Sequence, residues 1–131
     1  AAPKPFTSAE YLFNKFIEIM ESSYPKDRKV ETYAKRLNVS AKYLSLVCKQ
    51  VCHQTCSALI NQYVARDIER QLRFSPKNIK EITHEMGFPN PSFFTRFVKR
   101  HLGASPKTLR ERWTRELNLT DSETAPDNQS K

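Results

Sequence analysis

The stretch CKQVCHQTC carries three cysteines at four-residue intervals, Cys48, Cys52 and Cys56, and it places His53 between the last two. Thiolates and imidazoles are the ligands that Zn²⁺ takes in proteins, and residues four apart share one face of a helix. Structural zinc sites, however, usually combine a short cysteine pair with a second pair or with two histidines farther along the chain. The sequence has no such second pair, so we expect neither a metal nor another cofactor.

An internal repeat gives a second interpretation of the cysteines. A shift of fifty residues places YLSLVCKQVCHQTCSALI (43–60) on FFTRFVKRHLGASPKTLR (93–110), and a shift of forty-nine aligns the segments that precede them. In this alignment, bulky apolar residues align with bulky apolar residues, small hydroxyl residues with small hydroxyl residues, and lysine with lysine. The sequence therefore predicts one supersecondary unit that occurs twice.

The repeat assigns an apolar partner to every cysteine: Val98, Leu102 and Pro106. Because a free cysteine packs like a small hydrophobic residue, we expect Cys48 and Cys52 on the inner face of a helix and Cys56 at the start of the next. His53 pairs with Gly103, so we expect a left-handed backbone at His53, at a modest conformational cost.

Helical periodicity runs through almost the whole chain, which contains only two glycines. We predict an all-α fold of about seven helices, in which two helix-turn-helix subdomains are joined by a long linker helix. The expected boundaries are a tail at 1–9, a first subdomain with the linker helix at 10–74, a second subdomain at 75–117, and a disordered polar tail at 118–131.

The positive charge is concentrated on the predicted folded region. The chain has a formal net charge of +8 and a pI near 9.6, and residues 26–113 hold 18 basic against 7 acidic side chains, net +11. A polyanion is the natural partner of such a surface. No run of eighteen apolar residues and no secretion signal occurs, so we expect a cytoplasmic protein with no membrane segment.

The chain offers little for catalysis. His53, His84 and His101 fall on separate predicted elements, and no serine, cysteine or carboxylate has a base and an orienting partner at motif spacing. With 131 residues the chain can form one or two small cores, which favours a binding module. We therefore expect that the protein is not an enzyme.

Each copy of the repeat reads as a short helix, a tight turn and a second helix, expected over about 41–52 and 91–101. In a helix-turn-helix unit the second helix enters the DNA major groove and its early exposed residues meet base edges. The helix predicted at about 57–73 would span roughly 25 Å. A spacer of that length could hold two reading helices near the roughly 34 Å that separates successive major-groove segments on one face of DNA.

The segment IKEITHEMGFPNPSFFTRFVKRHLGASPKTLR carries a Gly-Phe turn, paired aromatics, a Phe-x-Lys element and Gly-x-Ser-Pro before the last helix. These motifs, within a match over about residues 10–113, resemble the C-terminal DNA-binding domain of AraC/XylS transcription regulators. The resemblance implies a sequence-specific binder of double-stranded DNA from a bacterial regulator. It also implies an N-terminal sensing or dimerising domain before residue 10 and a contact with RNA polymerase. The first copy departs from the family pattern at His53, where glycine is usual, and at Cys56, where proline is common.

The resemblance also implies which residues meet DNA. The base-reading positions are Lys42, Ser45, Leu46, Asn90, Ser92, Thr95 and Arg96, and the phosphate-contacting positions are Ser40, Lys49, Lys80, Lys99, Arg100 and Lys107. Arg96 is the strongest base reader because its planar fork suits bidentate contact with guanine. Leu46 offers only apolar contact, as to a thymine methyl group.

Several other residues have more than one interpretation. Six basic residues lie at expected helix starts or exposed faces and could neutralise phosphates: Lys35, Arg36, Lys77, Lys80, Lys107 and Arg110. The helical spacing of five aromatic residues indicates core packing and not stacking on bases: Tyr43, Phe93, Phe94, Phe97 and Trp113. The alternative function is a basic helical protein–protein interaction module, with structured RNA as a weaker third partner.

Overall fold

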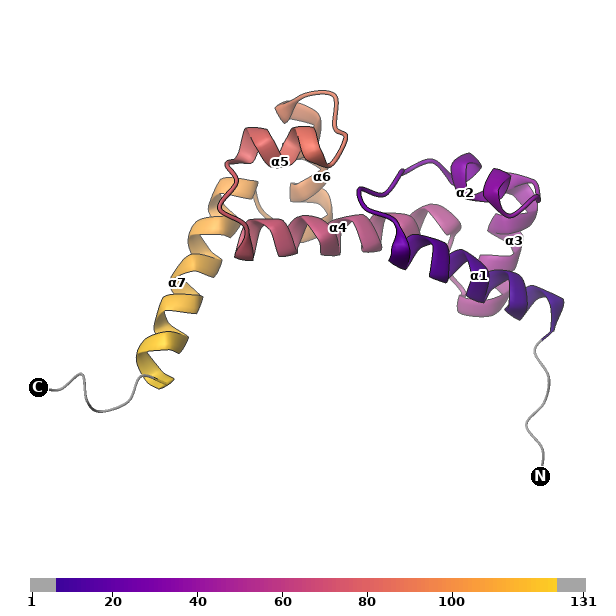
Figure 1. Ribbon diagram of the computed structural model, residues 1–131, viewed down its shortest axis with the longest axis horizontal. Helices are drawn as coiled ribbons and strands as arrows, with labels where there is room; N and C mark the ends of the chain where they lie inside the picture. The colour runs from indigo at the N-terminus through magenta and orange to yellow at the C-terminus, as the bar shows by residue number, and fades with distance from the viewer. Residues whose placement is uncertain (1–6, 125–131) are drawn as a thin grey trace, which may run out of the picture. The chain divides into compact units, whose positions relative to one another are not determined.

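The computed structural model describes residues 7–124, which form seven α-helices and no strand (Figure 1). The helices are α1 (Ser8–Ser22), α2 (Val30–Arg36), α3 (Ala41–Cys52), α4 (Cys56–Phe74), α5 (Ile79–Glu85), α6 (Pro91–Leu102) and α7 (Pro106–Thr124). The prediction of an all-α fold is confirmed. Within the described residues, no helix has both the length and the apolar character needed to cross a bilayer.

The chain divides into two compact units, and the division falls between Arg66 and Asp67, inside α4. The boundary predicted from the sequence lies at residue 74, at the end of this helix. A hydrophobic repeat shows where a helix ends, whereas the division between units depends on which side chains pack together. The first turns of α4 pack with the first unit and the last turns with the second.

In the first unit, α3 packs against both α1 and α2 (Figure 1). The edge of the Phe16 ring meets the Tyr33 ring at 5.5 Å between centroids, and both residues are buried with Leu44 and Ile60. The Tyr33 hydroxyl donates to the Asp27 carbonyl at 2.6 Å. Burial of these apolar side chains fixes the inner face of α3 against the core. The opposite face of α3 remains exposed to solvent.

In the second unit, α6 packs against α5 and α7. Phe88, in the turn between α5 and α6, contacts the rings of Phe94 and Phe97, each at 5.2 Å between centroids. Ile82 and Leu109 are also buried in this unit. The aromatic residue in the turn therefore fixes the angle at which α6 leaves α5.

The backbone of the two units repeats at the turns. Among the described residues, φ is positive at four: Asn38 (59°), His53 (63°), Gly87 (78°) and Gly103 (92°). Asn38 and Gly87 occupy the turn before the second helix, and His53 and Gly103 follow the end of that helix. The His53 N–H donates to the Lys49 carbonyl at 3.1 Å, as the Gly103 N–H does to Lys99. The predicted left-handed backbone at His53 is confirmed.

Replacing His53 with glycine is expected to raise the free energy of unfolding by about 1 kcal/mol, because a side chain is strained in the left-handed region that glycine adopts freely. Urea denaturation of the two proteins measures the difference. Asn38→Gly is a matched control at a similar φ and should gain only a few tenths, since asparagine tolerates this conformation. An unchanged or lowered stability in His53→Gly would mean that the imidazole stabilises the helix end.

Helix α7 extends into the C-terminal segment that was predicted to be a polar tail. The polar tail expected at 118–131 is helical as far as Thr124, and residues 125–131 lie outside the described residues. No glycine or proline interrupts the chain between Pro106 and Pro126, so nothing in the local sequence stops α7 earlier. At the other end, the capping box formed by Thr7 and Glu10 starts α1 at Ser8, within the tail expected at 1–9, of which residues 1–6 lie outside the description.

Candidate nucleic-acid interface

The outer face of helix α3 carries both polar and apolar side chains. Ser40 starts it by accepting the Tyr43 N–H on its hydroxyl at 3.0 Å. Leu44, Val47 and Cys48 point into the core and are fully buried. On the opposite side of the helix, Lys42, Leu46 and Lys49 are exposed, and Ser45 is half-buried.

A shallow groove of about 450 Å³ lies along this face, lined by Ser40, Lys42, Tyr43, Ser45, Leu46 and Lys49. All five residues of the first unit that were predicted to meet DNA line it. Periodicity alone brings them together, because positions three and four apart share a helix face. Tyr43 is the one lining residue that was not predicted there.

The helix α6 has a matching outer face. Asn90 starts it by accepting the Phe93 N–H at 3.0 Å, and Pro91 follows at the first helical position. Phe94 and Val98 are buried. Pro91, Ser92, Thr95, Arg96 and Lys99 line a groove of about 400 Å³ on the opposite side.

Two aromatic residues depart from the prediction of core packing. Tyr43 is 43% exposed and Phe93 is 50% exposed, whereas Phe94 is buried and Phe97 and Trp113 are partly buried. Tyr43 and Phe93 are the third residues of their helices, and each precedes the residue that enters the core. One helical step of about 100° turns them out of the core. The Arg96 guanidinium lies over the Phe93 ring at 5.3 Å from the centroid.

Comparison with known proteins decides the family. The profile of a family described as "Helix-turn-helix domain" matches residues 33–112, from α2 into α7. The chain belongs to the AraC-type helix-turn-helix family. The match includes α3 and α6 with their grooves.

Solved structures share the fold of this AraC-type domain. The C-terminal domain of AraT, a response regulator from Geobacillus stearothermophilus, has a TM-score of 0.72 and 22% identity, covering 81% of this chain and 88% of that one. An AraC-type transcriptional regulator from Chromobacterium violaceum has a TM-score of 0.69 and 18% identity, covering 80% and 94%. At these identities the likeness supports the fold alone.

A curated relative is similar in sequence. The Msm operon regulatory protein of Streptococcus mutans is 26% identical over 105 residues, which cover 80% of this chain and 38% of that protein. The AraC-type domain therefore spans well under half of the length of this relative.

The predicted DNA-contacting residues outside the two grooves lie at other exposed places. Lys80 is exposed on α5, Arg100 on the last turn of α6, and Lys107 on the first turn of α7. Asn90 also lies outside both grooves, and its side-chain oxygen caps α6. The structure thus gathers nine of the thirteen predicted residues into grooves and leaves these four apart.

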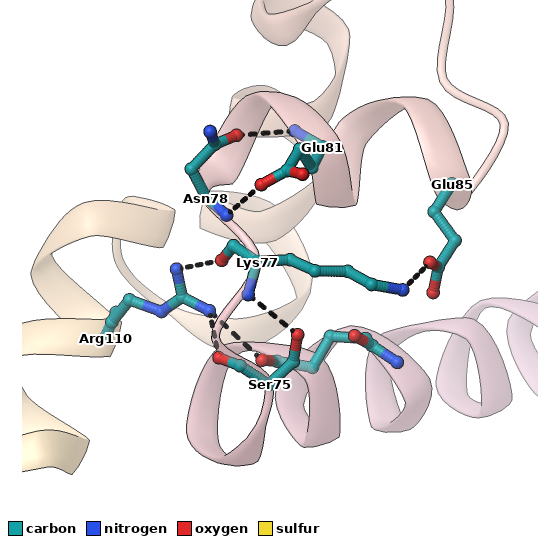
Figure 2. Close-up of polar contacts among 7 residues, drawn as sticks. Ser75, Lys77, Asn78, Glu81, Glu85 and Arg110 are labelled. Atoms are coloured by element: carbon teal, nitrogen blue, oxygen red, sulfur yellow. Dashed lines mark hydrogen bonds and ion pairs between the residues drawn. The ribbon is translucent and has the colours of Figure 1, made fainter.

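Arg110, which was a candidate for phosphate contact, is used inside the second unit of this AraC-type domain (Figure 2). Its guanidinium donates to four backbone carbonyls at the end of α4 and in the loop after it, those of Leu72 (3.0 Å), Gln71 (3.2 Å), Ser75 (3.0 Å) and Lys77. The last carbonyls of a helix have no partner within the helix, and Arg110 supplies one from α7.

Lys77, another of the phosphate candidates, also has a partner within the second unit. Its ammonium pairs with the Glu85 carboxylate at the end of α5 (Figure 2). The next residue, Asn78, forms a capping box with Glu81 that starts α5, with hydrogen bonds of 2.8 and 2.9 Å. The contacts of Arg110 and Lys77 join α4, α5 and α7. Such polar contacts cannot be predicted from the hydrophobic pattern.

Cys48 and Cys56 pack as the repeat predicted, whereas Cys52 is only partly covered. Cys48 and Cys56 are fully buried, and Cys56 is the first residue of α4. Cys52 is half-buried and its thiol donates to the Cys48 carbonyl at 3.2 Å. The hydrogen bond with Cys48, together with burial, raises the pKa of the Cys56 thiol. Across the part of the chain that the structure describes, no three His, Cys, Asp or Glu side chains gather as metal ligands.

Proposed function

We propose that this chain is the sequence-specific DNA-binding domain of a bacterial transcription regulator, in which α3 and α6 enter successive major-groove segments of one duplex. One observation carries the proposal. The outer positions of the two helices match at a separation of fifty residues: Lys42 with Ser92, Ser45 with Thr95, Leu46 with Arg96, and Lys49 with Lys99. Two equivalent faces, each rich in hydrogen-bond donors, suit a repeating polyanion.

The chemistry of the side chains suggests their roles. Arg96 would donate two parallel hydrogen bonds to guanine O6 and N7, and Lys42 can reach the same atoms as a point charge. The hydroxyl and amide side chains can bond several bases: Ser45, Asn90, Ser92 and Thr95. The remaining cations and one helix cap would meet phosphates: Ser40, Lys49, Lys80, Lys99, Arg100 and Lys107.

The proposal extends to the whole regulator. The curated relative is more than twice as long as the segment that this chain matches, so we infer an N-terminal sensing or dimerising domain in the intact protein. RNA polymerase would be the second partner where the regulator activates. Because such a regulator would act on the chromosome, we infer that the intact protein works in the bacterial cytoplasm.

Binding should weaken steeply with salt. If about six phosphates are neutralised, the affinity should fall by about 10³-fold between 50 and 200 mM salt, because binding releases condensed counterions. A titration of labelled duplex by fluorescence anisotropy at several salt concentrations gives the slope. A slope near zero would exclude phosphate contacts as the main source of affinity.

Selection from a random duplex library tests the proposal directly. We expect enrichment of two short motifs about one helical turn apart, one for each helix. Enrichment of a single motif would limit base reading to one helix. Weak, salt-sensitive binding with no enrichment would contradict sequence-specific reading and would favour a basic protein–protein interaction module.

A further inference from the structure

The outer face of α3 contains an apolar surface formed by two large side chains. Tyr43 is 43% exposed and Leu46 is 51% exposed, and both line one groove. Residues three apart on a helix are neighbours, so the ring and the leucine side chain form a continuous patch. Single exposed apolar side chains are common on proteins, but here two large ones lie at the centre of the face proposed to meet base edges.

The charges around this patch argue for its occupant. Lys42 and Lys49 line the same groove as Tyr43 and Leu46. The phosphates on either side of a DNA major groove would pair with these two flanking cations. The thymine 5-methyl group is the apolar group that base pairs present in that groove.

We propose that Tyr43 and Leu46 form a reading surface for thymine methyl groups, so that the DNA under α3 is defined by thymines at neighbouring positions. This inference rests on the proposed function and specifies the base class for the first unit. Tyr43 thereby becomes a specificity-determining residue that the sequence pattern had assigned to the core.

Phe93, which is the residue of α6 equivalent to Tyr43, has a different environment. The Phe93 ring lies beneath the Arg96 guanidinium at 5.3 Å, in an arrangement where a cation and an aromatic face attract each other. Phe93 is thus a positioning residue that holds Arg96 in a restricted orientation for guanine. In α3 the arginine is replaced by Leu46, and the aromatic ring is left to contact DNA itself. The operator should therefore be asymmetric, with thymines under α3 and guanine under α6.

Deoxyuridine substitution tests the inference, because uracil differs from thymine only in lacking the 5-methyl group. The duplex selected by the chain is used, and its thymines are replaced one at a time. Loss of a contacted methyl in the α3 half-site should weaken binding of the native chain by about 4-fold. The half-site under α6 is identified as the one where Arg96→Ala relaxes the base preference at one position, and uracil in that half-site should have no effect.

The variant Leu46→Ala distinguishes a methyl contact from a change in DNA stiffness. It should lose most of the sensitivity to uracil, whereas Leu119→Ala, which removes a leucine 62% exposed on α7, should keep it. Circular dichroism confirms that each variant is folded. Equal uracil sensitivity in the native chain and in Leu46→Ala, or an α3 half-site without thymine, would overturn the inference while sequence-specific binding stands. Failure of the library to yield any operator would overturn the proposed function and the inference with it.

Discussion

Replacing Arg110 with alanine is expected to lower the free energy of unfolding by about 1.5 to 3 kcal/mol, the range for hydrogen bonds to a charged group. The guanidinium donates to four backbone carbonyls around the end of α4. Alanine would leave these acceptors to water and would disconnect α7 from the loop before α5. The midpoint of urea denaturation should fall with little change in the slope m.

Two variants sharpen this test. Arg112→Ala removes an exposed arginine from the same helix and should change the stability by less than about 0.5 kcal/mol. Arg110→Lys keeps the positive charge but lacks the planar fork, so it should recover only part of the loss. If Arg110→Ala kept full stability and weakened DNA binding instead, the arginine would be a phosphate contact.

Replacing Arg96 with alanine is expected to weaken binding to the selected duplex by about 1 to 3 kcal/mol, or about 5- to 150-fold in Kd. Arg96 is exposed and lines the α6 groove, so its loss should not disturb the core. A bidentate contact discriminates among bases, and the variant should therefore also accept other base pairs at one position. Repeating the library selection with the variant measures that relaxation.

Arg100→Ala is the matched control for Arg96→Ala, because Arg100 is exposed on the same helix but lies outside the groove. It should weaken binding to all duplexes alike and reduce the salt slope by about 1. If Arg96→Ala produced the same uniform loss on random DNA, Arg96 would be a phosphate contact, and guanine reading would have to come from another side chain.

The positions of the helices were predicted from the sequence more accurately than the contacts between them. The second helices expected at about 41–52 and 91–101 are observed at Ala41–Cys52 and Pro91–Leu102, and the linker expected at about 57–73 is observed at Cys56–Phe74. These elements have strong signals, namely an apolar stripe preceded by a capping residue. The repeat added the left-handed backbone at His53, which no single copy would have revealed.

Residues that act through long-range contacts were beyond the sequence pattern. Arg110 reaches carbonyls more than thirty residues earlier in the chain, and nothing in its neighbourhood distinguishes it from the exposed Arg112. Tyr43 and Phe93 lie beside the apolar stripe, and whether such a position is covered depends on the packing of neighbouring helices. The outer faces of α3 and α6 were predictable because they are defined within one helix.

The buried sulfur atoms give the first unit a built-in chemical reporter. Cys48 and Cys56 are fully buried and Cys52 is half-buried, while the chain after residue 66 contains no cysteine. A thiol reagent such as an aromatic disulfide should therefore modify Cys52 first, and the other two only when the core around α3 opens. The slow phase of that modification would measure the opening of the first unit alone, without an introduced label.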